Sequence, residues 1–190
     1  MVLNRFFVVL FASFGLWAAS AVAPASAQST SVLTPKGLDP VEIGMTIEAA
    51  QKKLKAKLGR ISTMEAGFSK ERESTQPCWL WRRLDGVDPG INYMTEKHII
   101  IRIDIFTPIP PVVPMVKTRA GIGIGSPETE LKKKYGDGLM MEPQPSNPGV
   151  TWGVAERAGQ NGLRVEVHEG KVSGLLAARG KALDYPEACS

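Results

Sequence analysis

Residues 43–54 have the sequence IGMTIEAAQKKL, and residues 124–135 have the related sequence IGSPETELKKKY. In both stretches Ile-Gly is followed within two residues by a hydroxyl side chain, then by acidic residues and then by lysines. Apolar residues recur every three or four positions, which is typical of a short amphipathic helix. A motif that recurs along one chain predicts an internal duplication.

The two predicted helices have recognisable ends. The first is expected to begin at Thr46, whose side chain can cap it, and to end at Gly59. Its apolar face consists of Ile47, Ala50, Leu54 and Leu58. The second is expected to begin at Ser126 and to end at Gly136. Pro127 then falls in its first turn, where the missing N–H is harmless.

Strand-like runs follow each predicted helix. In the clearest run, 99–105, isoleucines alternate with Arg102 and Asp104, which predicts an antiparallel strand with one wet face. Segments 91–95 and 163–167 have apolar residues in phase when the halves are aligned. We therefore expect an α+β fold of two tandem repeats. Each repeat would be a short amphipathic helix, or helix pair, packed on a three- to four-stranded antiparallel sheet.

The N-terminus has the pattern of a secretory signal peptide. Arg5 is its only charged residue, an apolar run covers 6–17, and the Ala-Ser-Ala motif at 25–27 predicts cleavage after Ala27. The protein is therefore expected to be secreted or periplasmic, and no other stretch is long and apolar enough to span a bilayer. The predicted divisions are a signal peptide (1–27), a flexible lead-in (28–37), a first repeat (38–107), a Pro/Gly-rich connector (108–121) and a second repeat with a C-terminal tail (122–190).

Charge and cysteine content restrict the possible partners. Cleavage would remove one of the 23 basic residues and none of the 19 acidic ones, leaving a net charge of about +3, which is too mild to indicate nucleic-acid binding. Cys78 and Cys189 are the only cysteines, and an even pair in an oxidising compartment predicts a disulfide. Free thiols or a metal pair are the alternative, but the chain has no Cys-x-x-Cys or Cys/His grouping.

The stretch Gly44-Met45-Thr46-Ile47-Glu48-Ala49-Ala50, with Leu58-Gly59 after it, resembles the opening of the SmpA/OmlA (BamE-like) repeat. Two such units in tandem in a secreted chain resemble the β-lactamase-inhibitory-protein architecture. BamE-like proteins are lipoproteins of the outer-membrane assembly machinery, whereas this chain has no cysteine directly after the predicted cleavage site. The inhibitory proteins bind an enzyme across a concave sheet, so the resemblance implies recognition through a sheet surface.

Five residues are candidate binding contacts. Alignment of the halves places Trp79 and Trp81 on an outward face, beside basic residues that include Arg83. Tryptophan and arginine dominate interface hot spots, although either tryptophan could instead belong to the core. Arg102 and Asp104 could orient a ligand or form a solvated salt bridge. The nominal contact set is Trp79, Trp81, Arg83, Met94 and Arg102.

Other motifs give weaker signals for chemistry. His98 and His168 are the only histidines; each lies near a predicted turn and lacks the grouped ligands of a metal site or a partner nucleophile. Exposed turn residues are the simpler interpretation. The glycines at 121–125 do not form a phosphate-binding loop. No metal or cofactor is therefore predicted.

These observations favour a secreted or periplasmic non-catalytic binding or scaffolding module over an enzyme. It would recognise a protein or a cell-envelope component through its sheet surface, without nucleic acid and without a transmembrane segment after cleavage. The alternative is an envelope hydrolase that uses His98 or His168 with a nearby carboxylate.

Overall fold

The structure is a computed structural model that describes residues 31–61, 78–108, 114–186 and 189. The predicted signal peptide and its cleavage site lie outside the described residues. Strands account for 51% of the structure and helices for 17%, so the protein is mostly β rather than α+β.

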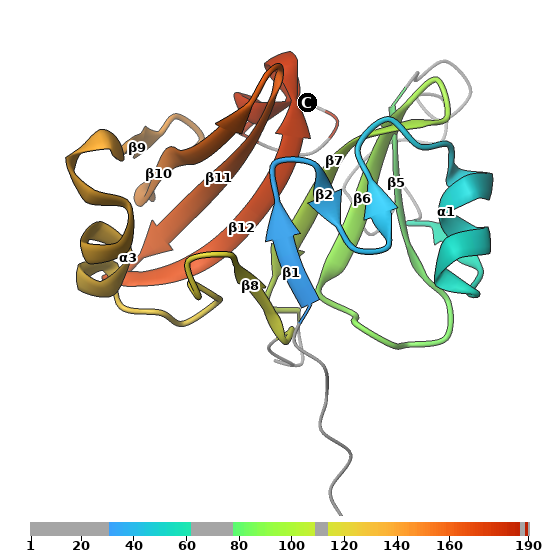
Figure 1. Cartoon of the computed structure of the whole chain (residues 1–190), viewed down its shortest axis with the longest axis horizontal. Coiled ribbons are helices and arrows are strands. Elements are labelled where there is room, and N and C mark those ends of the chain that lie inside the picture. The colour runs from blue at the N-terminus through green and yellow to red at the C-terminus, as the bar shows by residue number, and fades with distance from the viewer. Residues whose placement is uncertain (1–30, 62–77, 109–113, 187–188, 190) are drawn as a thin grey trace, which may run out of the picture.

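Eight strands form one continuous antiparallel sheet, in the order β4-β5-β6-β7-β12-β11-β10-β9 (Figure 1). Their bounds are β4 Leu58–Arg60, β5 Cys78–Arg83, β6 Ile91–Glu96, β7 Ile99–Phe106, β9 Glu142–Gln144, β10 Asn147–Ala158, β11 Asn161–His168 and β12 Lys171–Arg179. The two halves of the chain meet where β7 pairs with β12, with Ile105 opposite Leu175 and Ile103 opposite Ala177. The sheet therefore runs without interruption through both predicted repeats.

A second sheet of four short strands has the order β3-β2-β1-β8. Its strands are β1 Ser31–Thr34, β2 Gly37–Leu38, β3 Val41–Glu42 and β8 Val116–Thr118. It packs on one face of the large sheet, over the middle of the sheet near β7 and β12 (Figure 1). β1 comes from the predicted lead-in, and β8, its parallel neighbour, comes from the predicted connector.

The two helices flank the small sheet on that same face (Figure 1). They are α1 Ile47–Leu54 and α3 Glu128–Tyr135, and the 3-10 turns are η1 Gly136–Gly138 and η2 Gly180–Leu183. The Ile-Gly stretch before each helix bonds to the start of a long strand: Gly44 N–H donates to Ile100 O, and Gly125 N–H donates to Val172 O. These bonds fix each helix at its end of the sheet.

The observed ends of the two helices agree only in part with the ends predicted from the sequence. Thr46 caps α1 by accepting a hydrogen bond from the Ala49 N–H, as predicted. Gly136 ends α3, also as predicted, but Pro127 rather than Ser126 occupies the cap position. α1 ends at Leu54 because Lys55 adopts a left-handed conformation, so Leu58 lies on β4 and not on the helix.

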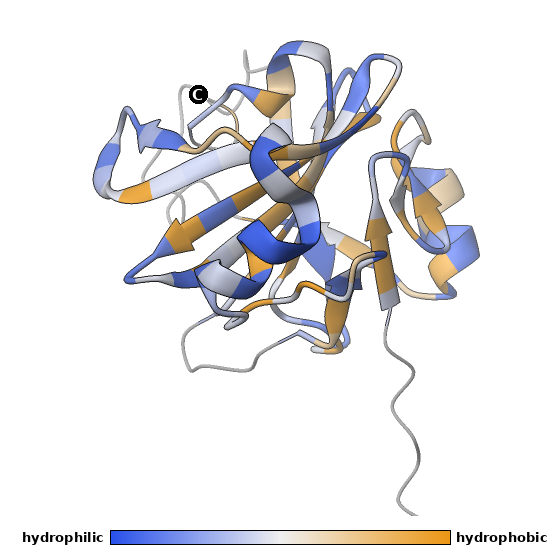
Figure 2. Ribbon diagram, turned by 60° about the vertical axis from the view of Figure 1, so that its left-hand side comes forward, coloured by the Kyte–Doolittle hydropathy of each residue, from blue (hydrophilic) through white to orange (hydrophobic). Residues whose placement is uncertain are grey.

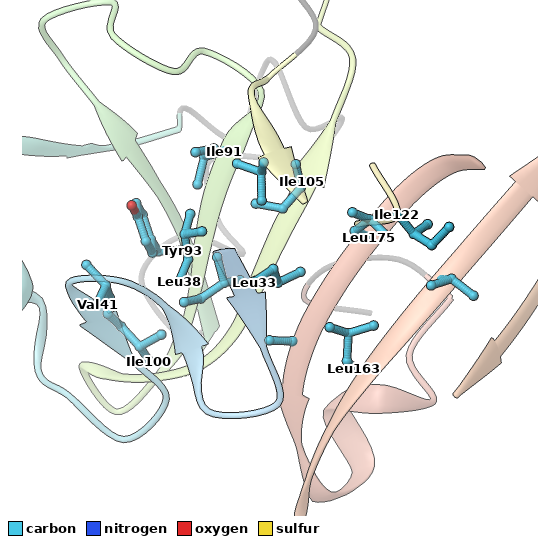
Figure 3. Packing of buried hydrophobic residues seen from close by; sticks show 14 of the residues in the cluster. Leu33, Leu38, Val41, Ile91, Tyr93, Ile100, Ile105, Ile122, Leu163 and Leu175 are labelled. Carbon is cyan, nitrogen blue, oxygen red and sulfur yellow. The ribbon is translucent and has the colours of Figure 1, made fainter. Parts of the chain in front are cut away.

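The main core fills the space between the two sheets and the helices. Figure 3 shows Leu33, Leu38 and Val41 of the small sheet packed against side chains of the large sheet such as Tyr93 and Leu163. Hydrophobic and hydrophilic residues alternate along the strands of the large sheet (Figure 2), as expected when its two faces differ.

β7 departs from the predicted simple alternation. The register of β6 on β7 shifts between Met94 and Thr95, which is a β-bulge. As a result Ile100, Ile103 and Ile105 face the main core, whereas Ile101 packs against a smaller cluster on the opposite face.

The predicted fold class, two helix-on-sheet repeats, is therefore wrong. Each helix has only eight residues, about two turns, and is too small to cover a sheet of its own. Separate sheets would also leave β7 and β12 as long unpaired edges, which is unfavourable, and here these strands pair with each other. The small sheet supplies much of the covering layer, and two of its strands, β1 and β8, come from the predicted lead-in and connector.

Candidate binding site

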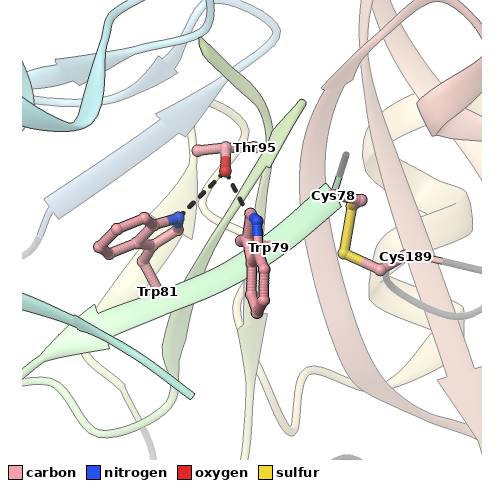
Figure 4. Close-up of a disulfide and its surroundings, with 5 residues drawn as sticks. All are labelled: Cys78, Trp79, Trp81, Thr95 and Cys189. Carbon is pink, nitrogen blue, oxygen red and sulfur yellow. Dashed lines mark hydrogen bonds between the residues drawn. A yellow bond between two sulfur atoms is a disulfide. The ribbon is translucent and has the colours of Figure 1, made fainter. Parts of the chain in front are cut away.

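A C-terminal segment lies against the other face of the large sheet, the face away from the main core. Residues 183–186 together with Cys189 are here called the C-terminal strap. Leu183 packs with Leu176 and Ala178 of β12 in a second hydrophobic cluster. Cys189 forms a disulfide with Cys78 at the start of β5, which confirms the predicted pairing (Figure 4). The face of the large sheet away from the main core is therefore partly covered, whereas the sequence predicted that it would be exposed to solvent.

Two buried arginines bind the backbone of the strap. Arg164 Nη1 donates to Leu183 O at 2.6 Å and to Tyr185 O at 3.0 Å, and Arg102 Nη1 donates to Tyr185 O at 2.9 Å. Arg164 is 2% exposed and Arg102 is 5% exposed. Because Arg102 of β7 and Arg164 of β11 both donate to Tyr185 O, the two arginines fix the position of the strap over the sheet.

Each arginine also pairs with the acid two residues further along its strand. Arg102 Nε lies 2.7 Å from Asp104 Oδ1, and Arg164 Nη2 lies 2.6 Å from Glu166 Oε1. The Arg164 guanidinium also stacks 4.0 Å from the ring centroid of Trp152. Burial lowers the pKa of Arg164, and the charge of Glu166 opposes that shift.

The sequence reasoning missed Arg164 and Glu166. A signal was present, because Arg102-x-Asp104 and Arg164-x-Glu166 have the same spacing within two strand-like runs. Residues two apart on a strand share a face, so each pair could have been placed on one side of the sheet.

Two hollows open beside the strap. The first, called the Asn92–Asp104 hollow, has a volume of about 330 Å³. Its lining residues are Asn92, Arg102, Asp104, Ile105, Phe106, Glu166, Gly174, Leu175, Leu176 and Pro186. The second, called the Trp152 hollow, has a volume of about 440 Å³ and includes Trp152, Arg157 and Arg164 in its lining.

Among the described residues, three side-chain atoms on this face are buried without a hydrogen-bond partner: Asn92 Oδ1, Asp104 Oδ2 and Arg164 Nε. Asn92 on β6 is directly opposite Asp104 on β7, so the two side chains are neighbours on the strap-bearing face. A buried polar atom without a partner costs about 1–3 kcal/mol. All three atoms have almost no accessible surface, so a molecule in the hollow does not reach them unless the side chains move.

The tryptophans of the predicted contact set lie on the core-facing side of the sheet. Trp81 packs against the main core, and its indole N–H donates to Thr95 Oγ1 at 3.0 Å (Figure 4). Arg60 stacks on Trp79 and Trp81, 4.3 Å and 5.3 Å from their ring centroids. Both rings are half-buried rather than fully outward-facing.

The other predicted contacts are placed differently. Arg83 forms two hydrogen bonds with Asp85, which raise the pKa of the arginine. Met94 is 0% exposed, so it offers no surface to a partner. Met94 and Arg102 are paired on the strap-bearing face, opposite to the tryptophans. Of the predicted set only Arg102 lines the hollow, so the structure does not bring the five residues together.

The histidines lie at opposite ends of the large sheet. His98 is in the turn before β7 and His168 ends β11, next to the turn before β12. Because β7 and β12 run antiparallel side by side, these two turns are at opposite ends. Both histidines are exposed, and His168 Nδ1 lies 2.9 Å from Gly149 O. A hydrolase that uses either histidine alone stays an untested alternative.

In the described part of the chain, no three or more His, Cys, Asp and Glu side chains are grouped as a metal site would require. Nor does any helix there have the length and apolar character needed to cross a membrane. No protein-family model matches this chain, and no similar protein was found among the curated proteins or the solved structures. The resemblance to the SmpA/OmlA repeat therefore stays a prediction.

Proposed function

We propose that this protein is a secreted, non-catalytic binding module whose ligand site is the strap-bearing face of the large sheet. The observation that carries the proposal is the Asn92–Asp104 hollow of about 330 Å³, in which the polar side chains of Asn92, Arg102, Asp104 and Glu166 lie among apolar ones. Ligand pockets are typically concave, with a small number of placed polar groups in a mainly apolar lining.

The way the site is held supports this proposal. Its polar side chains stand on β6, β7 and β11 of one sheet, and strands position groups more accurately than loops do. Gln144 of β9 donates to Pro186 O at 3.0 Å, so the strap is bound by β7, β9 and β11 and is linked to β5 by the disulfide. A preorganised site loses little conformational entropy when a ligand binds.

Secretion is the part of the proposal that rests on the sequence of residues 1–27. The disulfide is compatible with it, because such bonds persist in oxidising compartments. Mass spectrometry of the exported protein should give an N-terminus at Gln28. An intact leader in the mature protein would contradict this part.

Ligand capture tests the proposed site. The exported, disulfide-bonded protein is immobilised and exposed to a cell-envelope extract, beside the variants Asp104→Asn and Glu169→Gln. Both variants remove one negative charge, but Glu169 is exposed on the β11–β12 turn, away from the hollow. We expect a species retained by the wild type and by Glu169→Gln and lost with Asp104→Asn. Equal capture by all three proteins would contradict the proposed site.

A further inference from the structure

We propose that Arg60, which stacks on Trp79 and Trp81 at one edge of the large sheet, binds an oxyanion, either a carboxylate or a phosphate. Arg60 is on the edge strand β4, directly opposite Trp81 on β5, so the two side chains share a face of the sheet. This is the core-facing side, opposite to the strap. The inference therefore goes beyond the ligand site proposed for the strap-bearing face and does not depend on it.

The two indole rings hold the guanidinium in place. Arg60 Cζ lies 4.3 Å from the ring centroid of Trp79 and 5.3 Å from that of Trp81. Both distances are within the range of about 6 Å over which a cation is attracted to the face of an aromatic ring. An arginine that is already fixed in this way loses less side-chain freedom on binding a partner than a mobile arginine does.

A buried threonine ties this platform to the sheet. Thr95 is 0% exposed, and its hydroxyl accepts a hydrogen bond from the Trp81 indole N–H at 3.0 Å (Figure 4). The same hydroxyl donates to the backbone O of Trp79 at 3.4 Å. The platform under Arg60 is therefore built on two paired strands, β5 and β6, and not on a loop.

The hydrogen-bond donors of the stack remain available. Stacking uses the flat face of a guanidinium, whereas its N–H groups lie in its plane. Arg60 is exposed, and its side chain forms no hydrogen bond or ion pair within the described ranges. The Trp79 indole N–H also has no partner there, and its nitrogen is not among the buried unpartnered atoms, so it reaches solvent. A ligand that approaches from solvent can therefore contact these donors.

Charge and shape make an oxyanion the fitting ligand. A guanidinium is always positive and offers parallel N–H groups that match two oxygens of one carboxylate or phosphate. The indole of Trp79 can only donate, so an oxyanion gains hydrogen bonds here, whereas an amine would meet like charge. Arg119 is the useful comparison, because it is also exposed and without an ion pair in the part of the chain that the structure describes, but it has no aromatic ring to hold it.

Nuclear magnetic resonance of the exported, disulfide-bonded protein tests the inference through its indole N–H signals. Without residues 1–27 the chain has three tryptophans, Trp79, Trp81 and Trp152. The Trp152 indole N–H already donates to Glu142, and its ring stacks with Arg164 on the strap-bearing face, so its signal is an internal control. The probes are acetate, its neutral isostere acetamide, and inorganic phosphate, each added at constant ionic strength.

We expect acetate and inorganic phosphate to shift the Trp79 signal in a saturable way and to leave the Trp152 signal unchanged. Acetamide should bind about 5-fold or more weakly than acetate, because hydrogen bonds between charged groups are the stronger ones. Tighter binding of acetate than of phosphate would assign a carboxylate ligand, and the reverse order would assign a phosphate. No shift with either anion, or equal binding of acetate and acetamide, would overturn the inference.

Two arginine variants locate the binding. Arg60→Gln should weaken acetate binding about 5-fold or more, and the protein should stay folded because the replaced side chain is exposed, which urea unfolding checks. Arg119→Gln is the matched control, since it also removes one exposed positive charge, and it should bind acetate as the wild type does. Unchanged affinity in Arg60→Gln, or equal weakening in both variants, would overturn the assignment.

Discussion

Replacing Arg164 by methionine should strongly destabilise the protein. The side chain is 2% exposed and donates to Leu183 O, Tyr185 O and Glu166 Oε1. Removing one member of a buried ion pair costs about 3–5 kcal/mol, mostly because its partner is left buried and unpaired. The Glu166 side chain is 21% exposed and can recover some water, so we expect a loss of about 3 kcal/mol in the free energy of unfolding.

Arg83→Met is the matched control for this loss. Arg83 pairs with Asp85 at 2.7 Å, but the Asp85 side chain is 42% exposed, and pairs of this kind contribute about 0–1 kcal/mol. Urea unfolding followed by far-UV circular dichroism gives the loss in the free energy of unfolding for each variant. The comparison requires that the dependence of this free energy on urea concentration is the same in the wild type and both variants. Equal stability of the two variants, within about 0.5 kcal/mol, would refute the role of Arg164 in holding the strap.

Three further predictions concern the disulfide, the core and the tryptophans. Cys189→Ser should cost about 4–5 kcal/mol in the chain-entropy model, because Cys78 and Cys189 are 111 residues apart, and a loss below about 1 kcal/mol in urea unfolding would contradict this. Burial raises the pKa of Tyr93 to about 12, whereas a tyrosine in the unfolded chain ionises near pH 10. The contribution of neutral Tyr93 to the free energy of unfolding is therefore intact below pH 10 and is lost as the pH rises towards 12. Tyr93→Phe should reduce that alkaline loss by about 2–3 kcal/mol in unfolding measured at pH 9 and 12, and an unchanged pH profile would exclude the assignment. Thr95→Val should cost about 1–3 kcal/mol because it leaves the indole N–H of Trp81 without its acceptor, and unchanged thermal unfolding would count against that bond.

Features with a strong local signal were predictable from the sequence. The Thr46 cap and the glycine that ends α3 follow from backbone chemistry within a few residues. The disulfide followed from an even cysteine pair in a chain with an export pattern. The antiparallel strand 99–105 followed from its alternation, although its extra bulge residue did not, because a bulge depends on the partner strand.

Features that depend on distant parts of the chain were not predictable. β1 and β8 contain few apolar residues, and they form because they pair with each other in parallel and bury Leu33 and Val116 against the large sheet. The strap is similar, since its polar contacts with Arg102 and Arg164 come from strands far from it in the sequence. Local patterns carry no information on such pairings.

The candidate site was predictable only at Arg102. Trp79 and Trp81 were correctly placed on the same face of one strand, but on a face that packs towards the core. Which face of a sheet becomes covered depends on the small sheet and the strap. Neither covering layer has a periodic pattern in the sequence.

Crystals of the disulfide-bonded protein with and without the species captured from cell-envelope extract give the most direct test of the central claim, that the strap-bearing face holds a ligand site. We predict that the captured species lies in the Asn92–Asp104 hollow, in contact with lining residues such as Arg102, Glu166 and Phe106. A captured species bound elsewhere on the protein, with the hollow unchanged, would contradict the account.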